Sequence, residues 1–186
     1  MPDYYFDIET VPLEQYRSEN GASFDPQRAK IISIQFQLLD SRTGQALGDL
    51  KILKEWEQGS SEKKITEEIK RTYIDLGIWN FIPVGNNLLF ECKFMKYKLK
   101  QHCNVDGLKL GHRPMIDLKH TMVIMNGGSF KGYDKLLGKS GKAANMTHWY
   151  YDKNWSMIEQ YVVQETKDFV KAYAVLKRTL PRIALG

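Results

Sequence analysis

A nearly continuous apolar segment, IISIQFQLLD at residues 31–40, limits the folds that are open to this chain. Strands that are covered on both faces have this composition, whereas half-exposed strands alternate apolar and polar residues. Strands are also predicted at residues 4–12 and 50–56, one before and one after the apolar segment. We therefore expect a three-stranded meander in which residues 31–40 form a central strand.

The rest of the chain predicts helices and short strands in alternation. Apolar residues recur at helical spacing within residues 60–78, behind a serine that can cap a helix: Ile65, Ile69, Tyr73 and Leu76. The further predicted elements are a strand at 80–85, a helix at 87–103, a strand or turn followed by a helix at 114–128, a short helix at 133–139, a loop at 140–154 and a last helix at about 155–180. This order indicates an α/β fold with helices on the faces of one sheet.

Length and composition favour a single domain that spans residues 1–186. No apolar run approaches the ~20 residues that span a bilayer, and the N-terminus lacks the pattern of a secretion signal. Cys92 and Cys103 would stand roughly 16 Å apart on one helix, which is too far for a disulfide. We therefore expect a cytoplasmic protein with reduced thiols and no membrane contact.

The charge of the chain is unevenly distributed. The net charge is +5, but residues 93–142 contain eleven Lys and Arg against three Asp, so this segment carries +8 and the remainder −3. A basic part beside an acidic part suits a polyanionic ligand that is bound through metal ions. A solvated lysine-rich surface would account for the same pattern.

The first predicted strand, YYFDIETVP, places Asp7 and Glu9 on one face, because side chains two residues apart point to the same side of a strand. Two carboxylates repel each other in this arrangement unless a cation lies between them. An Asp-x-Glu pair alone is a weak signal, since many strands carry one on a solvent face. The pair indicates a metal site only if further acidic residues lie close to it in the fold.

Two later segments supply further acids. In VGNNLLFECKF, Glu91 falls in the first turn of a predicted helix, where the helix dipole by itself favours an acid. In the last predicted helix, Tyr161 and Glu165 are four residues apart and share a face with apolar residues that need burial. A buried glutamate is costly without a partner. A divalent cation would offset this cost and also the repulsion in the first strand.

The three segments together, FDIET, Asn-x-x-Phe-acid and Tyr-x-x-x-acid, resemble the DEDD 3′–5′ exonucleases of the ribonuclease H-like superfamily. The tyrosine is similar to that of the tyrosine subclass, and DIETVP followed by KIISIQF looks most like the exonuclease domain of family B DNA polymerases. The resemblance implies a ribonuclease H-like α/β fold, in which a mixed sheet of a three-stranded antiparallel meander plus parallel strands is flanked by helices. It also implies two Mg²⁺ or Mn²⁺ ions that hydrolyse phosphodiester bonds at the 3′ end of single-stranded DNA or RNA.

The resemblance assigns a role to each matching residue. The metal ligands would be Asp7, Glu9, Glu91 and Glu165, and Glu9 would also contact the terminal 3′-hydroxyl. Tyr161 would orient the attacking water. The residues of the motifs that would contact the substrate are Thr10, Asn87 and Phe90.

Two positions depart from the family pattern, because the family has Asp where this chain has Glu91 and Glu165. One extra methylene moves each carboxylate by about 1.5 Å, and Mg²⁺ demands near-ideal octahedral geometry. The departure is compatible with a site re-spaced by the backbone, with a preference for Mn²⁺, or with a weakened enzyme. Asp168, one turn beyond Glu165, is a possible substitute ligand.

Lysines provide candidates for substrate binding. Lys93, Lys96 and Lys100 follow Glu91 along one side of the predicted helix, where they could track a phosphate backbone. Lys139 and Lys142 lie in the glycine-containing segment GKSGK, which does not match a nucleotide-binding P-loop. These residues leave two other functions open: a nucleic-acid-binding module that has lost catalysis, or a protein-interaction subunit. A polymerase or another nucleic-acid-processing protein is a possible partner.

Overall fold

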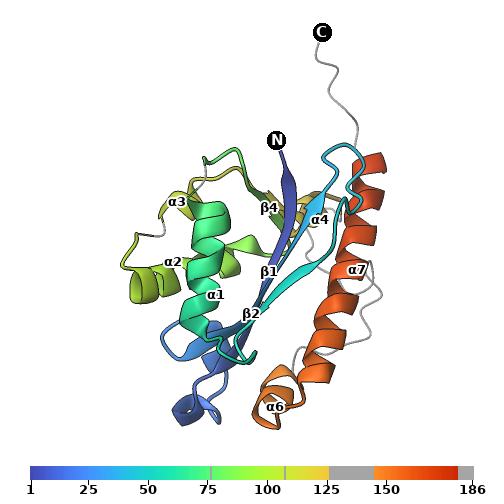
Figure 1. The fold of residues 1–186 in the computed structure, drawn as a ribbon. Helices are drawn as coiled ribbons and strands as arrows, with labels where there is room; N and C mark the ends of the chain where they lie inside the picture. The colour runs from blue at the N-terminus through green and yellow to red at the C-terminus, as the bar shows by residue number, and fades with distance from the viewer. Residues whose placement is uncertain (76, 107, 126–144, 180–186) are drawn as a thin grey trace.

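The computed structural model describes residues 1–75, 77–106, 108–125 and 145–179. Five strands form one mixed sheet in the order β3-β2-β1-β4-β5 (Figure 1). Strands β3, β2 and β1 are antiparallel, whereas β4 and β5 run parallel to β1. The bounds of the strands are β1 Asp3–Pro12, β2 Ala29–Leu39, β3 Lys51–Lys54, β4 Ile82–Gly85 and β5 Ile116–Asp117.

Helices cover both faces of this sheet (Figure 1). Helix α1 Glu62–Ile69 is continued by a π-helical turn, Lys70–Ile74, and the long helices are α2 Leu88–Cys103 and α7 Trp155–Thr179. The shorter helices are α3 Leu108–Gly111, α4 Leu118–Met125 and α6 Met146–Tyr151, with 3-10 turns at Glu14–Tyr16 (η1) and Ala22–Phe24 (η2). Helices α1 and α2 lie on one side of the sheet and α7 lies on the other.

The side chains of β1 alternate between these two helical layers. Phe6 and Ile8 are buried in the core cluster that includes residues of α1 and α2. Tyr5 belongs to a separate cluster with Phe169 of α7, and the two ring centroids are 4.9 Å apart. The alternation of a strand therefore directs Asp7 and Glu9, which have the parity of Tyr5, toward α7.

The predicted α/β sheet with a leading meander is confirmed. The apolar segment forms the interior strand β2, in which Ile31, Ile32 and Ile34 are fully buried. Ser61 caps α1, and its side chain accepts a hydrogen bond from the backbone N–H of Lys64 at 3.2 Å. Cys92 and Cys103 carry free thiols. Among the described helices, none combines the length and apolar composition needed to cross a membrane.

One predicted loop is wrong in part. Residues 140–154 were expected to lack a helix, but Met146–Tyr151 form helix α6. The reason is tertiary: Met146 is buried in a cluster with Val11, Ile32 and Ile158, and this burial stabilises a segment too short to be stable alone. The helix predicted at residues 133–139 lies outside the described residues.

Candidate metal centre

The four acids predicted as metal ligands line one pocket of about 690 Å³, here called the acidic pocket. Strand β1 contributes Asp7 and Glu9, helix α2 contributes Glu91, and α7 contributes Tyr161 and Glu165. Segments more than 150 residues apart in the chain therefore meet at one place. The structure places all five of these residues in the pocket where the sequence reading expected them to converge.

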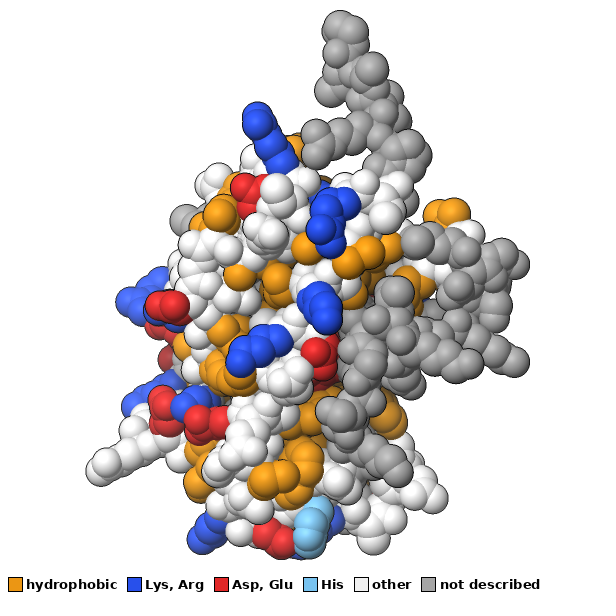
Figure 2. All heavy atoms as spheres, turned by 90° about the vertical axis from the view of Figure 1, so that its right-hand side faces the viewer, with side chains coloured by type: hydrophobic (Ala, Val, Ile, Leu, Met, Phe, Trp, Pro, Cys, Tyr) orange, Lys and Arg blue, Asp and Glu red, His pale blue; other side chains and the backbone are white. Residues whose placement is uncertain are grey.

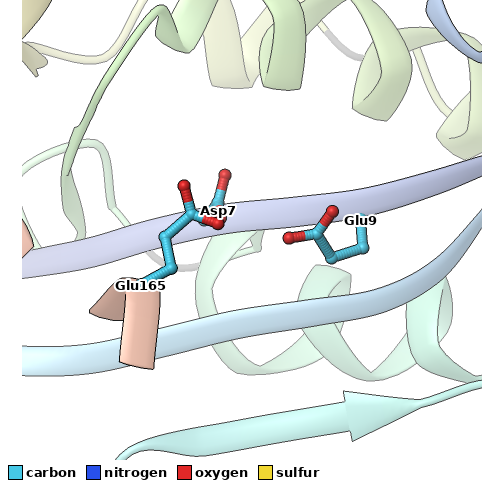
Figure 3. A group of neighbouring side chains, drawn as sticks. All are labelled: Asp7, Glu9 and Glu165. Atoms are coloured by element: carbon cyan, nitrogen blue, oxygen red, sulfur yellow. The ribbon is translucent and has the colours of Figure 1, made fainter. Parts of the chain in front are cut away.

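Three of the carboxylates form a tight group. One oxygen from each of Asp7, Glu9 and Glu165 lies within 4.8 Å of the other two. Figure 3 shows the three carboxylates directed toward one another, with Glu165 reaching across from α7 to β1. Tyr5 donates a hydrogen bond from its hydroxyl to Asp7 Oδ2 at 3.2 Å. Three hard oxygen ligands at this spacing are a suitable donor set for Mg²⁺ or Mn²⁺.

Glu91 stands deeper than the tight group and is only 4% exposed. Burial raises the pKa of Glu91 well above the usual value of 4.5, and the Asp7 carboxylate, a hydrogen bond with Asp7 and the charge of Asp117 raise it further. Its Oε2 atom is buried and has no hydrogen-bond partner among the described residues. A buried carboxylate oxygen without a partner is costly, and this cost favours a bound cation or a proton.

Tyr161 packs beside the tight group and lies on α7 one turn before Glu165. Burial raises the pKa of Tyr161, and the charges of Glu9, Glu165 and Asp7 and a hydrogen bond to Glu165 act in the same direction. The hydroxyl therefore stays protonated at neutral pH and serves as a donor. Its ring lies 6.0 Å from that of Trp149, which fixes its position in the wall of the pocket.

The predicted substrate-contact residues of the motifs also line the acidic pocket. Thr10 donates its hydroxyl to the carbonyl oxygen of Ser23 at 2.8 Å and so holds η2 against β1. Asn87 accepts a hydrogen bond on Oδ1 from Lys119 Nζ at 2.8 Å. Phe90 packs edge-on against Phe24, with ring centroids 6.1 Å apart. These contacts make the rim of the pocket a preformed surface.

The remaining candidates that the structure describes do not line the acidic pocket. Lys93 and Lys96 line a neighbouring groove and not the acidic pocket. Lys139 and Lys142 lie outside the described residues. Asp168 accepts a hydrogen bond from Gln164 at 2.9 Å and does not line the pocket, so its proposed use as a substitute ligand is wrong for this arrangement.

The backbone of Gly85 at the end of β4 lies very close to that of Phe6 in β1, and this contact positions the junction between β4 and α2. A Cβ atom at Gly85 would lie 2.8 Å from the carbonyl oxygen of Phe6 and 2.6 Å from Cδ2 of Leu88, closer than real contacts allow. Asn87 then takes the left-handed conformation with φ of 66°, which asparagine tolerates better than most residues. These two features turn the chain sharply into α2 and bring Glu91 beside β1.

Two residues of this region were missed by the sequence reading. Asn86 lines the acidic pocket, and its Oδ1 atom is buried without a hydrogen-bond partner among the described residues. Asp117, at the end of β5, accepts hydrogen bonds from the backbone N–H groups of Asn87, Leu88 and Lys119 at 2.8 to 2.9 Å. Both lie at the carboxyl ends of parallel strands, where ligands of α/β sheets bind. That position is the signal that could have found them.

We expect Asp117→Ala to lower the free energy of unfolding by about 2 kcal/mol, the upper end of the range for loss of a helix cap. Three backbone N–H groups at the start of α2 and α4 lose their acceptor, and urea denaturation measures the loss. Asp40→Ala is the matched control, because Asp40 accepts from the backbone of Arg42 and Thr43 in an exposed turn. Equal losses in the two variants would contradict a special role for Asp117.

Comparison with known proteins does not place the chain in a family. No protein-family model matches it, and no curated protein matches it. The residues and geometry of the acidic pocket are therefore the basis on which a function is proposed.

Proposed function

We propose that the chain is a metal-dependent 3′–5′ exonuclease that hydrolyses phosphodiester bonds at the 3′ end of single-stranded nucleic acid by a two-metal mechanism. One observation carries the proposal: four acids from three distant segments meet in one pocket, with Tyr161 beside them. The order of the strands, an antiparallel meander followed by two parallel strands, supports a ribonuclease H-like sheet.

The residues of the acidic pocket supply carboxylate oxygens, the ligands that divalent cations such as Mg²⁺ prefer. Asp7, Glu9 and Glu165 offer oxygens within 4.8 Å of one another. Glu91 offers a buried Oε2 atom without a partner among the described residues and hydrogen-bonds Asp7. Asp7 therefore links the other two members of the tight group to Glu91, and all four acids would hold the cations. Bound cations would lower the pKa of a water and neutralise charge on the scissile phosphate.

Other side chains of the acidic pocket would position the attacking water and the substrate. Tyr161 keeps its proton at neutral pH because its pKa is raised, so its hydroxyl can hold a water in line with the phosphate. Thr10 and Phe90 form walls against which a terminal nucleotide can rest. Asn86 lines the same pocket beside these residues. The pocket volume of about 690 Å³ lies within the range of small-ligand sites.

The test is digestion of 5′-end-labelled single-stranded DNA and RNA in the presence of Mg²⁺ or Mn²⁺. We expect a ladder that shortens from the 3′ end and mononucleotides as products, and no products in EDTA. A single-stranded circle serves as the matched substrate without an end and should remain intact. Cleavage of the circle, or release of the labelled 5′ nucleotide first, would refute exonuclease action from the 3′ end.

A second function is favoured by one observation. Among the described residues, Glu91 is not a member of the group whose oxygens lie within 4.8 Å of one another. If the backbone holds Glu91 too far away for the second ion, the chain would bind nucleic acid without cutting it. Salt-dependent binding of an oligonucleotide with no cleavage in either metal would favour this binding module.

A further inference from the structure

A second groove, of about 790 Å³, opens on the outer side of α2 and is here called the lysine groove. It is lined by Lys93, Lys96, Tyr97 and Lys100 of α2 and by residues that precede β2. Two of its lining residues, Gly21 and Phe24, also line the acidic pocket. The two depressions therefore share a wall at η2, and a chain that leaves the acidic pocket over Phe24 enters the lysine groove.

The lysines occupy the solvent side of α2 in a regular row. Lys93, Lys96 and Lys100 are exposed, while Phe94 and Leu99 between them are fully buried against the sheet. The row extends about 10 Å along the helix axis at 1.5 Å per residue. This length is enough to contact more than one phosphate of an extended strand.

The hydrogen-bond partners of Lys93 and Lys100 in the described part of the chain do not neutralise their charge. Lys93 Nζ lies 3.4 Å from the carbonyl oxygen of Phe24, and Lys100 Nζ lies 3.2 Å from Oδ1 of Asn104. Both of these acceptors are neutral. The groove also contains Asp106 and Asp25, but Asp25 forms an ion pair with Arg28 at 3.5 Å. Among the described residues that line the groove, the three lysines therefore outnumber the carboxylates.

Aromatic rings mark the boundary between the two depressions. Phe24 is 65% exposed, which is unusual for a phenylalanine that contacts another ring. It stands edge-on to Phe90 in the wall of the acidic pocket. An exposed ring beside a row of cations is the combination that binds unpaired bases and phosphates without sequence preference.

We propose that the lysine groove binds the phosphate backbone of a single strand on the 5′ side of the scissile bond, and that Phe24 stacks on a base where the strand leaves the acidic pocket. The polarity of the strand rests on the proposed function of the acidic pocket, because the 3′ end must lie among the carboxylates. The groove thus sets the preference for single strands and the minimum length of a good substrate.

The test compares two triple variants that remove the same charge. In the first, Lys93, Lys96 and Lys100 become Ala. In the second, the three cations that line a separate groove on α7 become Ala: Lys167, Lys171 and Arg178. Figure 2 shows that Lys and Arg side chains are spread over the face that α7 presents, so this control also removes cations from a basic surface.

Binding is measured in EDTA by fluorescence anisotropy of a labelled oligothymidylate at several salt concentrations. We expect the groove variant to make the negative slope of log K against log salt shallower by about 2, since each phosphate contact with a single strand contributes about −0.7. The α7 variant should leave the slope nearly unchanged. Equal losses in both variants, or no loss in the groove variant, would overturn the proposal.

A substrate-length experiment separates contact with the strand from damage to α2. A dinucleotide has a single phosphate, which is the scissile one, so none is left for the lysine row and its kcat/KM should be the same in the groove variant and the wild type. The kcat/KM for a long oligonucleotide should fall. Equal losses on both substrates would mean that the lysines act through the fold of α2, and the proposal would be wrong.

These readouts distinguish failure of the groove from failure of the proposed function. Binding in EDTA does not depend on catalysis, so a groove that binds the strand in a chain that never cleaves would support the groove and refute the exonuclease. Cleavage of a long strand that is indifferent to the three lysines would support the exonuclease and refute the groove.

Discussion

Asp7→Asn should lower the rate of cleavage of a single-stranded substrate by at least ~100-fold while the metal-free protein becomes more stable. Asn keeps the shape of the side chain and an acceptor for the Tyr5 hydroxyl, which donates to Asp7. It removes a charge from carboxylates that lie within 4.8 Å of one another. A loss of this size already follows from a displacement of the reacting groups by about 1 Å, and the loss of a ligand is a larger change.

Thermal unfolding without MnCl₂ measures the stability of the metal-free protein. The same experiment with MnCl₂ measures how much the bound cation stabilises the folded state. A cation whose free concentration is 100 times its Kd stabilises the folded state by about 2.7 kcal/mol. Asp7→Asn should lose most of this stabilisation. Asp168→Asn is the matched control, because Asp168 lies on α7 but does not line the acidic pocket. If Mn²⁺ stabilises Asp7→Asn as much as the wild type, Asp7 is not a metal ligand.

Glu91→Gln should change how the stability of the metal-free protein depends on pH. Burial, the contact with Asp7 and the charge of Asp117 raise the pKa of Glu91 well above 4.5. Above pH 4.5 the unfolded chain releases this proton while the folded chain retains it, so the folded state binds more protons. Stability therefore falls as the pH rises from about 4.5 to the folded pKa, by up to about 1.4 kcal/mol per pH unit from this group.

The glutamine variant has no proton to release at this position, so its stability should fall less steeply over the same window. Urea denaturation in EDTA at a series of pH values measures the slope. Glu67→Gln is the control, since Glu67 is an exposed residue of α1 that pairs with Lys63. A slope in Glu91→Gln equal to that of the wild type would show that Glu91 does not hold a proton when the metal is absent.

The same substitution tests the role of Glu91 in metal binding. A ligand that must lose a proton gives a metal affinity that rises with pH. We expect Mn²⁺ affinity of the wild type to increase as Glu91 ionises and that of Glu91→Gln to be lower and less dependent on pH. Calorimetry at two pH values measures both quantities. The tight group of Asp7, Glu9 and Glu165 should keep a residual site in the variant.

Local patterns predicted much of the architecture and the candidate pocket. The apolar run of β2 required cover on both faces, and the spacing of Asp7 and Glu9 placed both on one side of β1. The spacing of Tyr161 and Glu165 placed both on one side of α7, where they are half-buried and line the acidic pocket. Each of these inferences depends on the period of a strand or a helix, which neighbouring residues fix.

The sequence by itself determined which residues point the same way, because strand and helix periods act over a few positions. Only the tertiary structure decided that Asp117 caps α2, that Asn86 lines the acidic pocket and that Phe24 joins the pocket to the lysine groove. These relations link residues tens of positions apart. They depend on how the buried faces of separate elements pack, and no local period encodes that packing.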